Sequence, residues 1–512
     1  MNEMDPTFRF DANAVKTHDG GKPDAKRRAE LNAIAEQVAT QYRHDSMSPI
    51  IVSGTLRLVE FGILVVTGLI IYLVYVGINH ALMWQYPAAI LGGSAAMVIV
   101  LELADVYQIG ALRKPWSQAP RILFSWSGIF AMLALIGFFL KISEDFSRVW
   151  LASWFVTGFL SLLLLRVVLA RFIRVWARNG KMERRALIVG GGKTAESLIR
   201  SIELQADNDI RICGIFDDRD DVRSPSVVAG YPKLGTVGEL IEFARIARID
   251  MLIVAMPLTA EARVLTLLKR LWVLPVDIRL SAHANKLQFR PRSYSHIGSV
   301  PMLDIFDKPI NDWDSVAKRM FDIVFSLMGI VALSPIMLGA AIAIKLDSPG
   351  PILFRQKRHG FNNEEIDVLK FRSMYTNMSD PTAKQAVTKS DPRVTKVGRF
   401  IRKTSIDELP QFFNALRGDL SLVGPRPHAV YAQTRDRMFG EVVEGYFARH
   451  KVKPGVTGWA QINGWRGEID SDEKIKMRTE YDLWYIENWS LWLDLKILFM
   501  TPLKLLNTEN AY

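Results

Sequence analysis

The chain has 512 residues, of which 49% are apolar and 23% are charged, and its formal net charge is +11. This balance excludes a disordered protein and allows two or three folded units. The single cysteine, Cys213, excludes an internal disulfide and a cluster of cysteine metal ligands. The positive charge indicates a basic face, which nucleic acid, anionic lipid or a phosphorylated substrate would suit equally well.

Four stretches without a charged residue follow a polar N-terminal segment, residues 1–54. Each approaches the ~20 residues that a helix needs to cross a bilayer, and they are Phe61–Ile78, Ala81–Leu101, Ile122–Leu140 and Val149–Leu165. Lysine and arginine gather before the first, between the second and third, and after the fourth, whereas the other side has only Lys141 and Arg148. The sequence predicts four transmembrane helices within residues 55–178, with both flanking segments in the cytoplasm.

Residues 179–312 are predicted to form a Rossmann-like α/β domain with a linker, because short apolar runs alternate with helical patterns. The first run, Ala186–Val189, leads into a G-x-G-x-x-A turn, Gly190–Ala195. Asp217 and Asp218 follow near the position of a ribose-binding acid. Because glycines also serve a tight turn with nothing bound, ligand binding by this domain stays open.

A fifth apolar run, Ile323–Ile344, is long enough to cross a bilayer, but basic residues flank both of its ends. A full crossing would put one basic flank on the wrong side. Ser334 and Pro335 lie at its centre, where proline removes a backbone donor and disfavours helical geometry in the residue before it. We predict a re-entrant helix over residues 320–345, broken at these two residues, in a mainly helical catalytic domain over residues 313–512. A kinked ordinary span is the alternative.

The last third of the chain surrounds one acidic pair, Asp407-Glu408, with basic residues. Adjacent carboxylates repel each other unless cations or a metal neutralise them. Spacing alone favours another interpretation, in which Ser405 and Glu408 form a capping box or Asp407 caps a helix that has Pro410 in its first turn. The two interpretations are compatible, because a helix N-terminus that accepts a carboxylate also accepts a phosphate.

Three histidines, His359, His428 and His450, lack the spacing of metal ligands and are predicted to lie on the surface or behind a site. The aromatic residues between Tyr481 and Trp492 are typical of helices that lie in the headgroup region, although a soluble aromatic core would look similar.

From about Lys318 to Tyr512 the chain resembles the monotopic phosphoglycosyl transferases. Four spans and an α/β domain make it similar to the long members of that family, the polyprenyl-phosphate hexose-1-phosphate transferases. The matching motifs are Ser334-Pro335, Lys370-Phe371-Arg372-Ser373-Met374, Asp407-Glu408-Leu409-Pro410-Gln411, Gly424-Pro425-Arg426-Pro427 and Lys453-Pro454-Gly455-Val456-Thr457-Gly458. Asn363 stands where the family commonly has glycine, and asparagine tolerates a left-handed backbone better than most residues.

The resemblance implies an enzyme that transfers hexose-1-phosphate from a UDP-sugar to undecaprenyl phosphate. The sugar that it favours is glucose. The reaction would release UMP and would be the first step in the synthesis of an exopolysaccharide or capsule repeat unit. Asp407 would form an aspartyl phosphosugar, and Glu408 would hold Mg²⁺. The basic residues implied as phosphate or substrate ligands, with Arg426 assigned to the nucleotide, are Arg355, Lys370, Arg372, Arg393, Arg402, Arg426 and Lys453.

The same resemblance implies the bacterial inner (cytoplasmic) membrane, with the catalytic domain on its cytoplasmic face and membrane lipids as partners. Nucleic acid is not expected as a partner, because the basic residues lie beside membrane segments and form no known recognition module. The alternatives are UDP-galactose as donor, a non-catalytic membrane scaffold for polysaccharide export, and an oxidoreductase centred on Gly190–Ala195. The sugar, the polysaccharide and the existence of a homodimer stay open.

Overall fold

The computed structural model describes residues 15, 31–43, 48–77, 83–107, 109–112, 115–142, 145–178, 183–204, 210–219, 225–257, 260–281, 294–297, 300–378, 391–428, 433–434, 437–443, 445–467, 469 and 471–505. The chain divides into two compact units. One contains the apolar helices between Asp45 and Arg184, and the other contains nearly all the rest of the chain.

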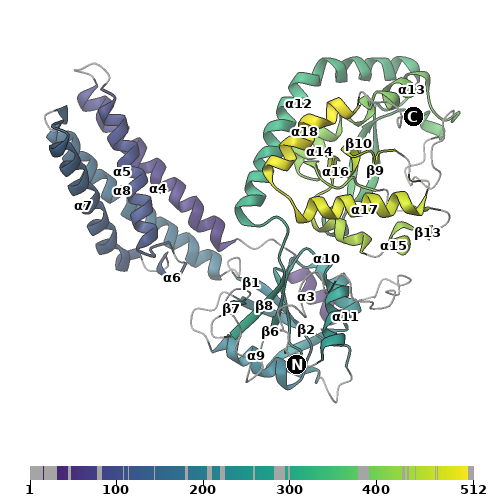
Figure 1. Ribbon diagram of the computed structural model, residues 1–512, viewed down its shortest axis with the longest axis horizontal. Coiled ribbons are helices and arrows are strands. Elements are labelled where there is room, and N and C mark those ends of the chain that lie inside the picture. The colour runs from purple at the N-terminus through teal and green to yellow at the C-terminus, as the bar shows by residue number, and fades with distance from the viewer. Residues whose placement is uncertain are drawn as a thin grey trace, which may run out of the picture. The chain divides into compact units, whose positions relative to one another are not determined.

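The helical unit consists of α4 (Pro49–Ile71), continued by the π-helical turn η1 (Tyr72–Val76), then α5 (Gln85–Leu103), α6 (Ile109–Leu112), α7 (Pro115–Phe139) and α8 (Arg148–Arg178) (Figure 1). α4 and α7 each pack against both α5 and α8. The four long helices have the length and composition to cross a membrane. They coincide with the four predicted apolar stretches.

Buried indole rings fill the centre of this unit. Trp126 and Trp154 meet edge to face with 5.3 Å between ring centroids, and both side chains are fully buried. Near one end of the helices, Arg166 forms a buried ion pair of 2.6 Å with Glu60, and Tyr107 donates to the same carboxylate. A buried charge needs such partners, so this cluster ties α8 to α4.

The α/β domain of the second unit is built on a mixed eight-stranded sheet of order β3-β4-β2-β1-β5-β6-β8-β7. The strands are β1 (Arg184–Val189), β2 (Ile210–Phe216), β3 (Val227–Val228), β4 (Tyr231–Gly235), β5 (Met251–Val254), β6 (Asp277–Ser281), β7 (Tyr294–Ile297) and β8 (Val300–Phe306). β1, β5 and β6 run parallel, as a Rossmann-like domain requires, while β8 is antiparallel to β6. The helices of this domain are α9 (Lys193–Glu203), α10 (Val237–Ile246) and α11 (Glu261–Leu271).

A short helix from the polar N-terminal segment, α3 (Ala33–Gln41), packs on α10 and β4 of this sheet. Asn32 caps α3 through the backbone N–H of Ala35 at 2.8 Å and donates to the carbonyl of Leu234 at 2.7 Å. Ala35 and Ala39, one turn apart, are fully buried. Sequence patterning did not indicate this contact, because two alanines make too small an apolar face.

The C-terminal part begins with α12 (Asp312–Asp347) and the antiparallel hairpin β9 (Leu353–His359) and β10 (Glu365–Phe371), whose tip carries η3 (Phe361–Asn363). Further elements are η4 (Thr376–Met378), α13 (Lys396–Lys403), η5 (Ile406–Glu408), α14 (Gln411–Arg417), β11 (Ser421–Val423), β12 (Gln433–Thr434), β13 (Arg437–Met438), α15 (Phe439–Val442), η6 (Tyr446–Lys451), β14 (Gly455–Thr457), α16 (Trp459–Ile462), α17 (Asp472–Glu487) and α18 (Leu491–Leu505). This part is mainly helical, as predicted.

The fifth apolar run lies in α12, which is helical from Asp312 to Asp347 without interruption at Pro335. Its ribbon changes direction along its length in Figure 1. Ser334, next to the proline, donates its hydroxyl proton to the carbonyl of Val331 at 2.8 Å. Large apolar side chains such as Leu338 are exposed along this helix, which suits contact with lipid.

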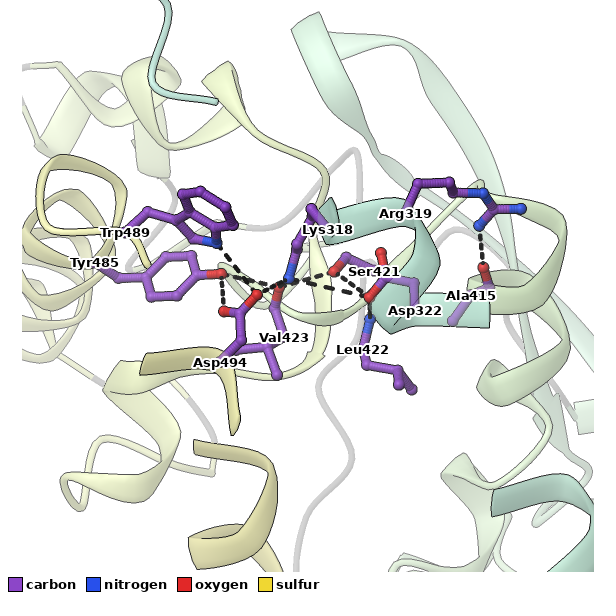
Figure 2. Close-up of polar contacts among 10 residues, drawn as sticks. All are labelled: Lys318, Arg319, Asp322, Ala415, Ser421, Leu422, Val423, Tyr485, Trp489 and Asp494. Atoms are coloured by element: carbon purple, nitrogen blue, oxygen red, sulfur yellow. Dashed lines mark hydrogen bonds and ion pairs between the residues drawn. The ribbon is translucent and has the colours of Figure 1, made fainter. Parts of the chain in front are cut away.

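A buried polar cluster joins the start of α12 to β11 and α18 (Figure 2). Lys318 forms an ion pair of 2.6 Å with Asp494 and donates to the carbonyl of Val423 at 2.8 Å. One turn later, Asp322 accepts the backbone N–H of Leu422 at 2.9 Å. Because β11 leads directly into residues 424–427, this cluster fixes that loop against the base of α12.

Candidate active site

The acidic pair lies on η5, the turn between α13 and α14. Ser405, before this turn, has a φ of 59° and makes no capping hydrogen bond; its hydroxyl accepts a hydrogen bond from Arg466 instead. α14 begins at Gln411, after Pro410, again without a side-chain cap. The capping interpretation is therefore wrong, because the left-handed residue ends one helix and the acids occupy a turn before the next.

Glu408 is held by two cations from distant segments. Lys370 Nζ lies 3.0 Å from Oε1, and Arg426 donates to both carboxylate oxygens, with Nη1 3.1 Å from Oε2. Burial alone would raise the pKa of Glu408, but Arg426 and Lys370 outweigh it and hold the pKa well below its ordinary value. Glu408 is therefore a fixed anion.

Asp407 has the opposite environment. Its carboxylate makes no hydrogen bond or ion pair with any residue that the structure describes. Burial raises the pKa of Asp407 to about 6, with Glu408 acting in the same direction and Lys370 and Arg402 opposing it. Two neighbouring acids whose environments separate their pKa values are a pattern of catalytic sites.

The β9–β10 hairpin determines which cations reach this pair. Lys370 is paired with Phe354 across the ladder, and Arg358 is paired with Ile366, so Lys370 and Arg358 lie on one face. Arg355 is paired with Leu369, which puts it on the opposite face, where it is exposed. The structure therefore brings Lys370 to the acids and keeps Arg355 away from them.

Three more of the predicted ligands have other neighbours. Arg372 is buried and donates to the carbonyls of Ser348 and Pro349 at 2.8 and 2.7 Å, after the end of α12. Arg393 is paired with Asp391 at 2.6 Å and holds the pKa of that acid at about 2. Lys453 is exposed, and the charge that acts on it most strongly is that of Arg319, which is also positive. Of the predicted ligands, Lys370 and Arg426 contact the acidic pair, and Arg402 acts on Asp407 through its charge.

Sequence reasoning did not single out three further arginines, of which Arg358 and Arg466 interact electrostatically with the acidic pair and Arg478 with Arg426. Arg358 donates to the carbonyl of Pro427, and burial together with Arg426 lowers its pKa to about 10. Burial, together with the like charge of Arg426, also lowers the pKa values of Arg466 and Arg478. Side chains alternate between the two faces of a strand, so the spacing of Arg358 and Lys370 along the hairpin could have indicated that both lie on one face. Arg466 and Arg478 belong to no local motif that could have indicated them.

In the described part of the chain, two carboxylates therefore face a surplus of cations. Such a surplus is costly in a buried site unless an anion completes it. The geometry suits a ligand that carries several negative charges, such as a diphosphate.

The comparisons with known proteins agree with this chemistry. A family model described as bacterial sugar transferase matches residues 313–508, and one described as CoA-binding domain matches residues 102–282. A UDP-glucose:undecaprenyl-phosphate glucose-1-phosphate transferase from Xanthomonas campestris pv. campestris is 33% identical, over 89% of this chain and 94% of that relative.

The chain belongs to the bacterial sugar transferase family. An enzyme of the same description from Escherichia coli strain K12 is 38% identical, over 71% of this chain and 76% of its own length. A UDP-N-acetylgalactosamine-undecaprenyl-phosphate N-acetylgalactosaminephosphotransferase from Aeromonas hydrophila is 47% identical, over 36% of this chain and 42% of its own length. The predictions of the family and of an enzyme are confirmed, and the scaffold alternative is set aside.

Two of the three histidines that were predicted to lie on the surface or behind a site are in the interior of the sugar transferase. His428 and His450 are buried, so the surface interpretation is wrong for both. Burial and the neighbouring Arg449 hold the pKa of His428 well below its ordinary value, which keeps the ring neutral. Asn363 has a φ of 62°, so the left-handed backbone expected at that position is present.

A magnesium ion would find two neighbouring carboxylates here. Among the described residues, no group of three or more His, Cys, Asp or Glu side chains gathers around one point. Mg²⁺ is commonly held by one or two carboxylates together with substrate phosphates and water. Asp407 and Glu408 fit that pattern, provided that Glu408 exchanges a hydrogen bond to Lys370 or Arg426 for the metal.

The glycine turn of the sugar transferase's α/β domain borders a cavity of about 240 Å³, whose lining includes Gly190 and Asp218. Gly191 donates its backbone N–H to Asp217 at 2.6 Å, and Arg219 forms an ion pair with the same acid at 3.0 Å. In a dinucleotide-binding turn, such a backbone N–H would bind the pyrophosphate of the ligand. Here the carboxylate of Asp217 occupies that position. This arrangement favours the structural interpretation of the turn.

Proposed function

We propose that this sugar transferase moves glucose-1-phosphate from UDP-glucose to undecaprenyl phosphate, which releases UMP and starts an exopolysaccharide or capsule repeat. The observation that carries the proposal is the pair Asp407-Glu408, one acid unpaired and one held by two cations. The long relatives from Xanthomonas campestris and Escherichia coli, which are named for this reaction, support it.

The reaction has two steps in this proposal. A carboxylate oxygen of Asp407 forms a bond to the phosphorus that carries the sugar, the bond from that phosphorus to UMP breaks, and UMP leaves with the electron pair. A phosphate oxygen of undecaprenyl phosphate then attacks the same phosphorus, and the bond to Asp407 breaks. The acid is restored, and the product is undecaprenyl diphosphate glucose.

The cations of the site act on the phosphate charge. Lys370 and Arg426 stabilise the oxygens that gain charge as the nucleotide leaves, and Arg358 adds a third cation on the same hairpin face. One such preorganised donor is commonly worth about 3–4 kcal/mol in the transition state. Glu408 would hold Mg²⁺, which supplies neutralisation of the diphosphate when bound.

The membrane arrangement is the second part of the proposal. α4, α5, α7 and α8 cross the inner membrane as a four-helix bundle, and this even number returns the chain to its starting side. α3 packs on the α/β domain, so the segments before and after the bundle lie on one side. Basic flanks assign that side to the cytoplasm. α12 enters the inner leaflet, bends near Pro335 and leaves on the same face.

The donor is the part of the proposal that the site leaves most open. The relative from Aeromonas hydrophila is 47% identical over a part that amounts to 36% of this chain, yet it is named for UDP-N-acetylgalactosamine. Recognition of uridine diphosphate by this part therefore does not by itself choose the sugar. UDP-galactose remains the second candidate donor.

A purified preparation of the full chain tests the function. With Mg²⁺, undecaprenyl phosphate and radiolabelled UDP-glucose, we expect UMP release and labelled lipid, with less transfer from UDP-galactose. Removal of Mg²⁺ with a chelator should stop both products. Release of UMP that is independent of undecaprenyl phosphate over many turnovers would contradict the proposed transfer.

A further inference from the structure

Two buried arginines lie close together beside the Gly424–Pro427 loop, and they differ in their partners. Arg449, on η6, forms an ion pair of 2.5 Å with Asp482 and donates to the carbonyl of Arg426 at 2.8 Å. Arg478, on α17, has a relative exposure of 3% and donates to the carbonyl of Gly467 at 2.9 Å. Its Nε is buried without a hydrogen-bond partner.

Arg478 also lacks a counter-ion in the part of the chain that the structure describes. No described carboxylate forms an ion pair with it, and Asp482, the acid that acts on it electrostatically, is already bound by Arg449. The charge that affects it most is Arg426, which is also positive. Burial and this like charge lower the pKa of Arg478 to about 10, so the guanidinium remains charged at neutral pH.

A buried guanidinium with a like charge beside it destabilises the protein that contains it. Proteins tolerate such groups mainly at functional sites, where a ligand supplies the missing charge. Arg426, the charge that acts most strongly on Arg478, is itself bound to Glu408 of the acidic pair. An anion bound beside Arg426 would neutralise Arg478 at the same time.

We propose that Arg478 binds a phosphate group of a substrate, in the same anion site as Arg426. This inference rests on the proposed function for the identity of the substrate but not for the chemistry of the group. The phosphate belongs to the uridine diphosphate part of the donor or to undecaprenyl phosphate. The kinetic arms of the experiment separate these two sources.

A purely structural role for Arg478 predicts a different outcome. If the side chain served to clamp the Gly467 loop through its one backbone hydrogen bond, its loss would lower stability and leave phosphate binding unchanged. If Arg478 instead binds an anion, its positive charge is unfavourable in the ligand-free protein, and replacing it with a neutral side chain of similar size removes that charge. The ligand-free variant should then be at least as stable as the natural protein.

The experiment uses the full chain in detergent as natural protein and as three variants, Arg478→Gln, Arg478→Lys and Arg449→Gln. Thermal unfolding is measured without ligand, with UMP and with inorganic diphosphate. We expect Arg478→Gln to keep or raise the ligand-free Tm and to lose most of the rise in Tm caused by UMP or diphosphate. Arg449→Gln should lower the ligand-free Tm, because it leaves Asp482 buried without its partner.

Steady-state kinetics identify the source of the phosphate. Loss of a charged hydrogen bond should raise one KM about tenfold or more in Arg478→Gln. A rise in the KM for UDP-glucose assigns Arg478 to the donor, and a rise in the KM for undecaprenyl phosphate assigns it to the acceptor. Arg478→Lys, which keeps the charge but not the planar fork, should recover part of the affinity.

Retention of both KM values and of the ligand-induced rise in Tm by Arg478→Gln would overturn the proposal. So would a ligand-free Arg478→Gln variant that unfolds at lower temperature or fails to fold. A natural protein that binds UMP and diphosphate through Arg478 but transfers no glucose would contradict the proposed function and leave this role intact.

Discussion

Lys370 Nζ lies 3.0 Å from Glu408 Oε1, and this contact joins β10 to the turn that carries the acidic pair. Lys370 and Arg426 both form ion pairs with Glu408, and neither is paired with the adjacent Asp407. One acid is thereby fixed as an anion, and the other keeps an unshared carboxylate.

The first prediction concerns pH. Asp407 must be ionised to attack, and its pKa is raised to about 6, so the rate should fall as pH drops through that value. Because Arg402 lowers this pKa, Arg402→Gln should move the acid limb to higher pH. The burst of UMP release without lipid acceptor is the measurement, since it avoids titration of the lipid phosphate.

The exposed Arg417, which does not influence Asp407, gives the control variant Arg417→Gln, and its acid limb should stay in place. An acid limb in the ordinary carboxyl range of about 4, unchanged in Arg402→Gln, would contradict the assignment.

The second prediction concerns two glycines that hold the Gly424–Pro427 loop against β14. A Cβ added at Gly455 would lie 2.1 Å from the backbone nitrogen of Gly424, and one added at Gly424 would lie 2.5 Å from the carbonyl oxygen of Lys453. Gly455→Ala should therefore push the loop away, destabilise the protein by about 1–3 kcal/mol and remove most of the activity.

The matched control is Gly339→Ala on α12, where a Cβ meets nothing within 4 Å. It should leave the Tm and the turnover of the full chain unchanged. Equal behaviour of the two variants would show that this close approach of two backbones does not support the site.

How much of this structure the sequence predicts depends on the range of the interactions. The apolar runs, the parallel strands around β1 and the motifs of the last third are local, so their patterns indicated them. The meeting of Lys370 with Glu408 depends on hairpin register and on the path between residues 371 and 407, which no local pattern contains. Arg478 was missed for the same reason, because its neighbours come from three separate segments.

Two differences between prediction and structure have more specific causes. The capping box was inferred from Ser405 and Glu408 by spacing, but Ser405 adopts a left-handed backbone, and a capping residue requires an extended one. The resemblance implied both Arg355 and Lys370 as phosphate ligands, but alternation along the paired strands places the two side chains on opposite faces of the hairpin.

The third prediction concerns the buried cluster of Figure 2. Asp494 binds Lys318 at 2.6 Å and also accepts hydrogen bonds from Tyr485 and Trp489. Lys318→Met leaves this carboxylate buried without its counter-ion, which should lower stability by about 3–5 kcal/mol. Replacing both partners, as Lys318→Met with Asp494→Leu, should restore part of the loss.

Denaturant unfolding of the purified chain measures both effects. Disruption of the exposed pair Arg417–Asp419 serves as the comparison and should change stability by less than about 1 kcal/mol. A similar small change in Lys318→Met would mean that the cluster does not anchor α12.

The fourth prediction concerns the path of α12. The test uses single cysteines at positions 80, 377 and 510 in a Cys213→Ser background, treated in intact cells with a reagent that does not cross the membrane. If α12 enters the membrane from the cytoplasmic face and returns to it, the cysteines at 377 and 510 should be protected. The cysteine at 80 should react. Reaction at position 510 from the outside would mean that α12 crosses the membrane.

The central claim is that Asp407 carries the phosphosugar. The most direct measurement is to incubate the purified chain with UDP-glucose labelled in the sugar, without lipid acceptor, and to map the labelled peptide. We predict label on Asp407 and its release by undecaprenyl phosphate, with none bound in a folded Asp407→Asn variant. Transfer at a substantial rate by Asp407→Asn, or label on another residue, would contradict the account.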